Sequence, residues 1–483
     1  MSDSRVGGQT GDIETQRARQ FWPMTAGELA EFVGARLVGP QDMVVVGLAI
    51  DSREVKPGEA FVCIRGESVD GHDFIAQAVE RGAAAVVVDG DEVARAQEDT
   101  HGRAAVLALE GQPAVSVLQE LARKRAGAFR GTVIGITGSA GKTTTRELIR
   151  GVLGTRLDVL AAERNLNTEI GLPLAVSRAR GTEDVWVLEY GARKKGDIAL
   201  LTDIVAPDWA VITSIGYAHL GIMGSREEIY REKTSILARE KTRVAFLSSD
   251  DDFTERIRAA FSHLGFITAG FHPEDAVRIE NFVSRGCRGS SFQLVTGSER
   301  VDVAFRLPGR HNAILAALAA AVGLRAGISL EEAARALEEA SPVRMRLEGV
   351  SRSGYLFIND TYNANPASMR AALAVLADEE PEAGGVRVAI LGDMLELGDE
   401  TEALHRELGE ALAHTGVELV IYLGEQAAAV ERGFRLSGGH GSFVAAASHE
   451  EAARRLKAMA PSGSVVLLKG SRALSVEKVL DYV

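Results

Sequence analysis

A glycine-rich turn between a β-type run and a helical run is the feature that most constrains this chain. The apolar run Thr132–Ile136 leads directly into Gly138-Ser139-Ala140-Gly141-Lys142-Thr143, and the helical stretch TTTRELIRGVL follows. Glycines let backbone N–H groups wrap around phosphate oxygens, and a helix N-terminus adds positive potential. Ile136 stands where the general pattern has glycine, so the chain matches a shorter GxxGKT form. The sequence predicts a phosphate-binding P-loop, with a chance glycine turn as the alternative.

Two side chains of this turn have specific expected roles. The Lys142 ammonium can neutralise charge on the β- and γ-phosphates, and the Thr143 hydroxyl can ligate Mg²⁺. The expected nucleotide-binding residues of the turn are Gly138, Ser139, Ala140, Gly141, Lys142, Thr143 and Thr144.

Length and composition limit the class of protein. At 483 residues the chain exceeds what one hydrophobic core usually serves, so two or three domains are expected. The formal charge of −13 argues against nucleic acid or an anionic membrane as the main partner, because both attract basic surfaces. Only Cys63 and Cys287 are present, and no apolar run is long enough to span a bilayer. We therefore expect a cytoplasmic protein without stable membrane insertion.

Composition and periodicity divide the chain into an N-terminal tail and three α/β segments. The expected parts are a disordered tail (1–22) and domains at 23–110, 111–341 and 342–483. The first domain alternates short β-type runs with the amphipathic segment Asp73–Gly82. In the second, the runs 185–189 and 209–213 alternate with helical stretches, which is typical of a parallel sheet with crossover helices. The third has buried-strand runs that end in glycine and a polar residue, as in a Rossmann-like domain: 386–393, 417–425 and 464–471.

Three polar residues of the second segment are candidates for metal chemistry. Glu189 ends the run 185–189, and a carboxylate at that edge could reach a nucleotide-bound Mg²⁺. His219 follows the next run after a short turn. Each has a structural alternative: Glu189 as a solvated strand end, and His219 as a satisfied core histidine. Lys233 lies in the helical stretch EEIYREKTSIL, where a solvated surface lysine is the ordinary interpretation.

Other polar residues gather in the later part of the chain. Arg346 could offer a guanidinium to a phosphate or carboxylate, or could be a surface charge. Asp360 ends a strand-like run, and Asn365 with Pro366 is sufficient to make a turn. Asn312 could cap a helix or could contact a purine.

Taken together, these segments resemble the Mur ligase family over nearly the whole chain after the tail. The similar segments are 51–74, TGSAGKTTT (137–145), NLNTEIGLP (165–173), EYGA (189–192), AHLGIMGS (218–225), REKTSI (231–236), GRHN (309–312), MRLE (345–348), INDTYNANPASM (358–369), LGDMLELG (391–398) and LKGSR (468–472). The block DTYNANPASM is the most discriminating, and is similar to family members that add D-alanyl-D-alanine.

The resemblance implies a three-domain, ATP-dependent ligase with Mg²⁺ and assigns roles that residue chemistry alone leaves open. Metal would be held by Thr143, Glu189, His219 and a carbamylated Lys233. Asn312 and Asp360 would contact the nucleoside, with Arg346 near the γ-phosphate. The implied catalytic set is Lys142, Lys233, His219 and Arg346. The implied substrate-contacting residues are Asp51, Ser52, Arg53, His72 and Asn365.

The implied reaction joins D-alanyl-D-alanine to UDP-N-acetylmuramoyl-tripeptide through an acyl phosphate, in peptidoglycan precursor synthesis, with the enzyme acting as a monomer. A folylpolyglutamate-type or other amide ligase is one alternative, and a P-loop NTPase that does not ligate is another. The sequence also departs from the family pattern in ways that concern the substrate. The departing residues are Thr168, Ser214, Gly221, Leu315 and Met345.

Overall fold

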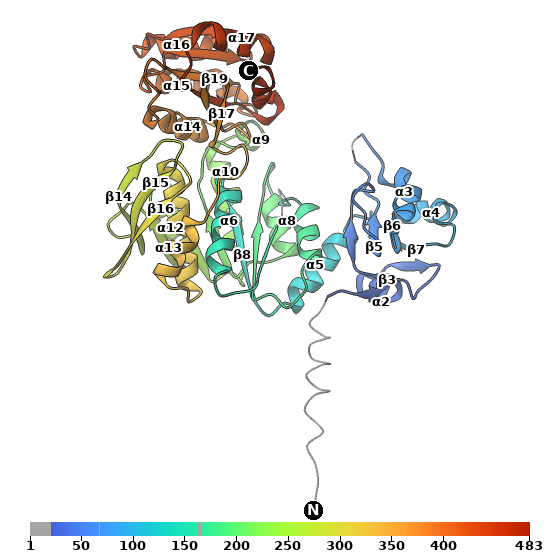
Figure 1. Cartoon of the computed structure of the whole chain (residues 1–483). Coiled ribbons are helices and arrows are strands. Elements are labelled where there is room, and N and C mark those ends of the chain that lie inside the picture. Colours follow the sequence, from blue (N-terminus) through green and yellow to red (C-terminus); the bar gives the residue numbers. More distant parts are fainter. Residues whose placement is uncertain (1–20, 67, 163–165) are drawn as a thin grey trace, which may run out of the picture. The chain divides into compact units, whose positions relative to one another are not determined.

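Three largely parallel sheets, of five, nine and six strands, organise the chain in this computed structural model (Figure 1). The structure describes residues 21–66, 68–162 and 166–483, so most of the expected tail and Asn165 of the 165–173 segment lie outside the described residues. The expected α/β fold class is confirmed. The three sheets fall within the three expected segments, whereas the domain boundaries themselves stay a prediction.

Contacts group the residues into two compact units. One comprises the described residues of the ranges 21–135 and 157–190, together with Ala199–Asp208. The other comprises Ile136–Arg156, Gly191–Ile198 and Trp209–Val483.

The first sheet has the order β2-β7-β6-β5-β4, with β4 to β7 parallel and β2 antiparallel. Its β6 is apolar at consecutive positions because both faces are covered: Val87 packs in one core, and Val86 and Val88 in another. Its strands are β2 (Arg36–Val38), β4 (Gly47–Ala49), β5 (Glu59–Val62), β6 (Ala85–Asp89) and β7 (Ala105–Leu109). The short strands β1 (Met24–Thr25) and β3 (Val44–Val45) form a separate antiparallel pair. The helices are α2 (Ala26–Val33), η1 (Gly71–Phe74), α3 (Ile75–Glu80), η2 (Gly90–Glu92) and α4 (Val93–Thr100).

The nine-stranded sheet has the order β16-β15-β14-β13-β12-β11-β8-β10-β9, so β8 lies between β11 and β10. Strands β11 to β14 are parallel, and β15 and β16 extend the sheet as an antiparallel hairpin. The strands are β8 (Thr132–Thr137), β9 (Val159–Ala161), β10 (Val185–Glu189), β11 (Trp209–Ile212), β12 (Val244–Ser248), β13 (Gly265–Gly270), β14 (Val277–Ser284), β15 (Ser290–Thr296) and β16 (Glu299–Phe305). The helices are α5 (Ser116–Ala128), α6 (Lys142–Leu153), α7 (Gly171–Ser177), α8 (Asp197–Ile204), α9 (Leu220–Met223), α10 (Arg226–Thr234), η3 (Ser235–Leu237), α11 (Thr254–Ala260), α12 (Arg310–Arg325) and α13 (Leu330–Glu338).

The six-stranded sheet has the order β17-β18-β22-β19-β20-β21 and is parallel except for β17. The strands β20 and β22 are buried along their whole length, and β19 is buried after its first residue, which explains their continuous apolar runs. The strands are β17 (Glu348–Arg352), β18 (Tyr355–Asn359), β19 (Arg387–Gly392), β20 (Leu419–Leu423), β21 (Ser442–Ala445) and β22 (Val465–Lys469). The helices are α14 (Pro366–Asp378), η4 (Gly398–Glu400), α15 (Thr401–Ala413), α16 (Ala427–Leu436), α17 (His449–Met459), η5 (Arg472–Leu474) and η6 (Val476–Tyr482).

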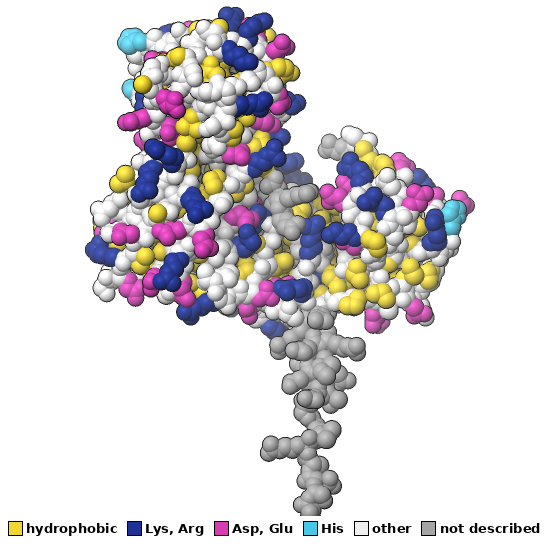
Figure 2. Space-filling model, viewed as in Figure 1, with side chains coloured by type: hydrophobic (Ala, Val, Ile, Leu, Met, Phe, Trp, Pro, Cys, Tyr) yellow, Lys and Arg dark blue, Asp and Glu magenta, His cyan; other side chains and the backbone are white. Residues whose placement is uncertain are grey.

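The surface carries charges of both signs. Figure 2 shows Lys and Arg side chains interspersed with Asp and Glu on the face in view. Within the part of the chain that the structure describes, no helix has the length and apolar character needed to cross a membrane.

Candidate functional site

The predicted P-loop connects β8 to α6. Gly138 and Gly141 have φ values of 147° and 80°, which favour glycine over residues with a side chain. A Cβ on Gly138 would lie 2.0 Å from Thr213 Oγ1, so this position has no room for a side chain. Ser214, two residues after the end of β11, binds the turn through two hydrogen bonds. Its carbonyl accepts from Ser139 N–H at 2.9 Å, and its hydroxyl accepts from Ala140 N–H at 3.3 Å. The backbone of the turn is therefore fixed in advance of any ligand.

Lys142 begins α6 and folds back over the turn. Its Nζ donates to the Gly138 carbonyl at 2.6 Å, which places the ammonium beside the loop backbone. The next two residues, Thr143 and Thr144, are 8% and 6% exposed in the first helical turn. The structure thus brings the cation, the hydroxyls and the helix N-terminus together, as phosphate binding requires.

Lys233 is buried, which excludes the surface interpretation. Its side chain, on α10, is only 2% exposed. Burial, reinforced by the nearby positive charge of Lys142, lowers the pKa of the Lys233 amine to about 7. Asp197 and Glu232 act in the opposite direction but do not offset this shift. A substantial fraction of the amine is therefore neutral near pH 7, and a neutral amine is the form that reacts with CO₂ to give a carbamate.

His219 lies in the same cluster of charges. Burial lowers the pKa of its imidazole; the Glu396 carboxylate opposes this shift, and Lys233 and Lys142 add to it. The His219 Nδ1 lies 2.5 Å from Glu396 Oε2. Because a carboxylate accepts, Nδ1 carries the proton and the Nε2 lone pair is left for another partner.

Glu189 ends β10, the strand that follows β8 in the sheet order. It is 1% exposed, so the alternative of a solvated strand end is wrong. The Asn167 amide donates to its Oε2 at 3.4 Å.

The donor chemistry of these residues fits Mg²⁺. A carboxylate, an imidazole nitrogen and the oxygens of a lysine carbamate form a predominantly hard ligand set. Over residues 21–66, 68–162 and 166–483, no group of three or more His, Cys, Asp and Glu side chains could hold a metal ion. Only Glu189 and His219 of the expected set are of these four types, so a third ligand besides the Thr143 hydroxyl depends on carbamylation of Lys233.

The later candidates occupy the start of the third segment. The Arg346 guanidinium lies 4.2 Å from the centre of the Tyr362 ring, and its Nε has no hydrogen-bond partner among the described residues. Asp360 accepts from Lys469 Nζ at 2.5 Å and from Leu347 N–H at 3.2 Å, so both of its carboxylate oxygens have partners within the protein.

Asn312 and Asn365 differ in how they contribute to their helices. The capping alternative for Asn312 is wrong: Gly309 is the N-cap of α12, and the Asn312 amide instead donates to the Pro308 carbonyl at 2.7 Å. Asn365 is the N-cap of α14, where its side chain accepts from Ser368 N–H at 2.9 Å. The local sequence accounts for Asn365 structurally, and a substrate contact for it stays a prediction.

The first-domain candidates fall into two groups. Asp51 accepts from the Arg53 guanidinium at 2.7 and 2.9 Å, and these hydrogen bonds lower the pKa of Asp51 to about 2. Ser52 donates to Gln77 at 2.6 Å. His72 is fully buried: its Nδ1 lies 2.6 Å from Asp70, and its Nε2 accepts from Asp89 N–H. In this structure His72 therefore fixes the loop after β5 with both of its ring nitrogens.

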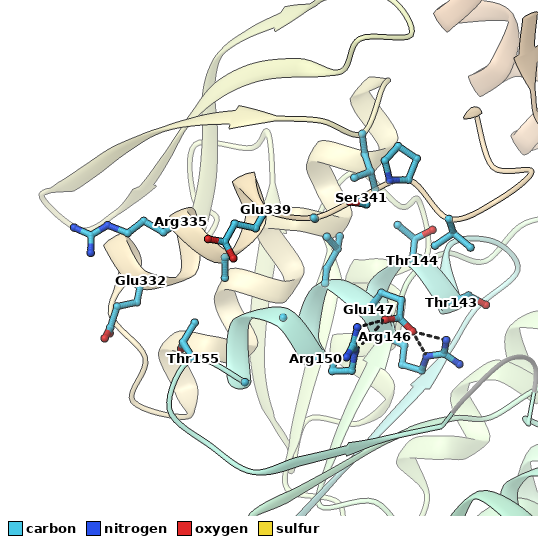
Figure 3. A pocket seen from close by; sticks show the side chains of 18 residues that line it. Thr143, Thr144, Arg146, Glu147, Arg150, Thr155, Glu332, Arg335, Glu339 and Ser341 are labelled. Atoms are coloured by element: carbon cyan, nitrogen blue, oxygen red, sulfur yellow. Dashed lines mark hydrogen bonds and ion pairs between the residues drawn. The ribbon is translucent and has the colours of Figure 1, made fainter. Parts of the chain in front are cut away.

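A pocket of about 770 Å³ opens along α6 from Thr143 and Thr144. Glu147 forms ion pairs with Arg146 and Arg150, at 2.6 and 3.0 Å. These three side chains of α6 line one side of the pocket (Figure 3). The opposite side comes from α13 and residues 339–343. Asn312 and Asp360 do not line this pocket.

Two departures from the family pattern, Met345 and Leu315, lie where the local structure limits the choice of residue. Met345, where glycine is frequent, has a φ of 62°, a conformation that glycine adopts more easily. Leu315 packs on the P-loop: a Cβ on Gly141 would lie 2.9 Å from its Cδ1.

Glu396 is a candidate residue that the sequence alone does not reveal, although its motif LGDMLELG is among the similar segments. Its partner His219 is 177 residues away, and no local pattern connects the two.

The glycine turn joins a buried strand to a helix, and the Lys142 ammonium lies against the backbone of the turn. Buried Lys233 and half-buried His219 are electrostatically coupled to Lys142. These features define a P-loop nucleotide-binding protein. Three family models match the chain: "Mur ligase family, catalytic domain" at residues 44–126, "Mur ligase middle domain" at 136–323, and "Mur ligase, glutamate ligase domain" at 345–472. The chain belongs to the Mur ligase family.

Individual relatives are similar over nearly the full length. The UDP-N-acetylmuramoyl-tripeptide--D-alanyl-D-alanine ligase of Bacillus subtilis (strain 168) is 33% identical, over 94% of this chain and 97% of the relative. A crystal structure of MurF from Acinetobacter baumannii matches with a TM-score of 0.83 and 31% identity, over 95% of this chain and 99% of that one. MurF ligase from Thermotoga maritima in complex with ADP matches with a TM-score of 0.75 and 28% identity, over 90% and 96%.

Proposed function

We propose that this chain is an ATP-dependent amide ligase that joins D-alanyl-D-alanine to UDP-N-acetylmuramoyl-tripeptide in peptidoglycan precursor synthesis. The observation that carries the proposal is a near full-length similarity, at 33% identity, to a ligase named for that reaction. The preformed P-loop and the electrostatically coupled group of Lys142, His219 and buried Lys233 support it independently, because they provide what phosphoryl transfer requires.

In the proposed reaction, the tripeptide carboxylate attacks the γ-phosphorus of ATP, forming an acyl phosphate and releasing ADP. The amine of D-alanyl-D-alanine then attacks the acyl carbon, and phosphate leaves as the amide forms. Neither step needs a covalent bond to the protein. The residues contribute by positioning the reactants and neutralising charge.

Each residue of the cluster has a proposed part in this reaction. Backbone N–H groups of the turn and the Lys142 ammonium hold the β- and γ-phosphates. Glu189, His219, carbamylated Lys233 and the Thr143 hydroxyl would hold Mg²⁺. When bound, Mg²⁺ supplies electrostatic stabilisation of the charge that develops on the transferring phosphoryl group. Arg346, whose Nε has no hydrogen-bond partner among the described residues, is available for a phosphate oxygen.

The substrate assignments are part of the same proposal. Asp51, Ser52, Arg53 and His72 would lie near the uridine diphosphate. Asn312 and Asp360 would contact the nucleoside of ATP. We also propose that the enzyme acts as a cytoplasmic monomer.

The test is an assay with ATP, UDP-N-acetylmuramoyl-tripeptide and D-alanyl-D-alanine, followed by mass spectrometry of the product. We expect phosphate release that requires both the carboxylate and the amine substrate, and a pentapeptide product. Lys142→Ala should lower the rate at least about 100-fold, because it removes a charge that stabilises the transition state. The matched control, Lys478→Ala, removes an exposed lysine and should leave the rate unchanged.

Two outcomes would contradict the proposal. Phosphate release that depends on neither substrate would favour a non-ligating NTPase. Ligation of glutamate to a folate, with no pentapeptide formed, would favour a folylpolyglutamate-type enzyme.

A further inference from the structure

Two segments that are distant in the sequence meet at His219. This residue precedes α9 as its N-cap, and Glu396 lies between β19 and η4, 177 residues later. The His219 Nδ1 is 2.5 Å from Glu396 Oε2, and the Gly221 N–H donates to the Glu396 carbonyl at 2.7 Å. Both segments belong to the same compact unit. Glu396 therefore contacts the α9 segment through its side chain and its backbone.

Two glycines make this close approach possible. A Cβ on Gly221 would lie 2.8 Å from Gly398 N, and a Cβ on Gly398 would lie 2.9 Å from Gly221 Cα. The clashing atoms are backbone atoms, so they could not move aside as a flexible side chain can. Gly221 is also one of the departures from the family pattern, where an acidic residue is usual. In this chain its lack of a side chain lets the segment 394–398 pack directly on α9.

The ion pair between His219 and Glu396 orients the imidazole ring but adds little to the stability of the fold. The His219 and Glu396 side chains are 24% and 47% exposed, and pairs this exposed contribute little to stability. The carboxylate does, however, select the tautomer of the ring that has its proton on Nδ1. It thereby orients the ring and leaves Nε2 free to act as a metal ligand.

We infer that Glu396 is a positioning residue for His219, and that packing of the segment 394–398 on α9 prepares the metal site. The inference rests on the proposed metal-binding role of His219. It gives the segment after β19 a role at the site, in which the Glu396 carboxylate acts through the His219 ring. Because coupling is reciprocal, metal binding should in turn favour the packed arrangement of the two segments.

The test measures Mn²⁺ affinity of the full chain with ADP present, together with the ¹⁵N shifts of histidine-labelled protein at pH 8. Glu396→Ala removes the carboxylate and should raise the Kd for Mn²⁺ about 10- to 100-fold, as is typical when the hydrogen-bond partner of a metal-bound histidine is lost. The same variant should shift the His219 signals from the Nδ1-protonated tautomer towards a mixture. The signals are assigned with His219→Ala.

Two further variants separate the carboxylate from the packing. Gly398→Ala retains Glu396 but introduces the clash with Gly221, and should also weaken Mn²⁺ binding. Glu400→Ala, a matched control, removes an exposed carboxylate whose side chain makes no cap hydrogen bond to α15, and should change neither measurement.

The outcomes distinguish the inference from the function on which it rests. If His219→Ala lowers Mn²⁺ affinity but Glu396→Ala changes neither the affinity nor the tautomer, the inference is overturned and the proposed metal role of His219 stands. If His219→Ala leaves Mn²⁺ affinity unchanged, both are overturned.

Discussion

Burial gives Lys233 a chemistry that a surface lysine lacks. The helical stretch around it, EEIYREKTSIL, is rich in charge, and the sequence alone favours a solvated ammonium. In the structure the side chain is 2% exposed and close enough to Lys142 for the two charges to repel. Both effects disfavour the ammonium form. Conversion to a carbamate would replace that repulsion with attraction between Lys142 and a negative group.

The pKa of about 7 predicts how carbamylation of Lys233 depends on pH. Below pH 7 the amine is mostly protonated and unreactive, and above pH 7 it is mostly neutral. At a fixed concentration of ¹³C-labelled CO₂, a carbamate signal in the ¹³C NMR spectrum should therefore grow between pH 6 and pH 8. The signal should be absent from Lys233→Arg. A signal of equal size at both pH values, or one that survives the substitution, would contradict this assignment.

Gly138 is the position at which adding a methyl group, by Gly138→Ala, should weaken nucleotide binding most directly. Its φ is 147°, and a Cβ would lie 2.0 Å from Thr213 Oγ1. Gly138→Ala should therefore distort the P-loop and weaken ATP binding by at least about tenfold, or roughly 1.4 kcal/mol. Isothermal titration calorimetry measures the change.

The matched control is Gly127→Ala, in helix α5. No atom lies within 4 Å of its built Cβ, so the substitution should leave ATP affinity unchanged and raise stability by up to about 1 kcal/mol. Equal ATP affinity in the two variants would show that the Gly138 turn does not bind the phosphates.

At the scale of elements, strands with continuous apolar runs were predictable. The run 185–189 coincides with β10, and 209–213 extends one residue beyond β11. Buried parallel strands are apolar on both faces, so their composition alone marks them. The hairpin of β15 and β16 was not among the expected elements. Its residues alternate between burial and greater exposure in an incomplete pattern. The two-residue turn Gly297-Ser298, with a φ of 55° at Gly297, is the sequence signal by which the hairpin could have been found.

The start of α14 can be tested as an element because one side chain caps it. Asn365 accepts from Ser368 N–H, the Ser368 hydroxyl accepts from Asn365 N–H, and Pro366 follows the cap. Asn365→Ala should lower the free energy of unfolding, measured in urea, by about 1 kcal/mol. Asn365→Ser should lower it much less, because serine is also a good N-cap. Equal losses in the two variants would contradict the capping role.

At the scale of the whole molecule, the candidate site was predictable only in part. The P-loop is local in sequence, so residues 138–143 identify it without any other segment. Glu189, His219 and Lys233 each have an ordinary structural interpretation when taken alone, and only the family resemblance groups them. Neither the local residue pattern nor the family resemblance points to Glu396, because its proposed role depends on a contact between segments 177 residues apart.

The proposed roles of Lys142, Glu189, His219 and Lys233 in holding a nucleotide and its metal ion can be tested together in one crystal. The most direct measurement is anomalous diffraction from crystals grown with Mn²⁺, bicarbonate and a non-hydrolysable ATP analogue. We expect the triphosphate on the 138–143 turn beside Lys142, and a Mn²⁺ peak within bonding distance of Glu189, His219 and a carbamylated Lys233. A Mn²⁺ peak held by the phosphates with none of these three side chains, or a triphosphate bound away from the turn, would contradict these roles.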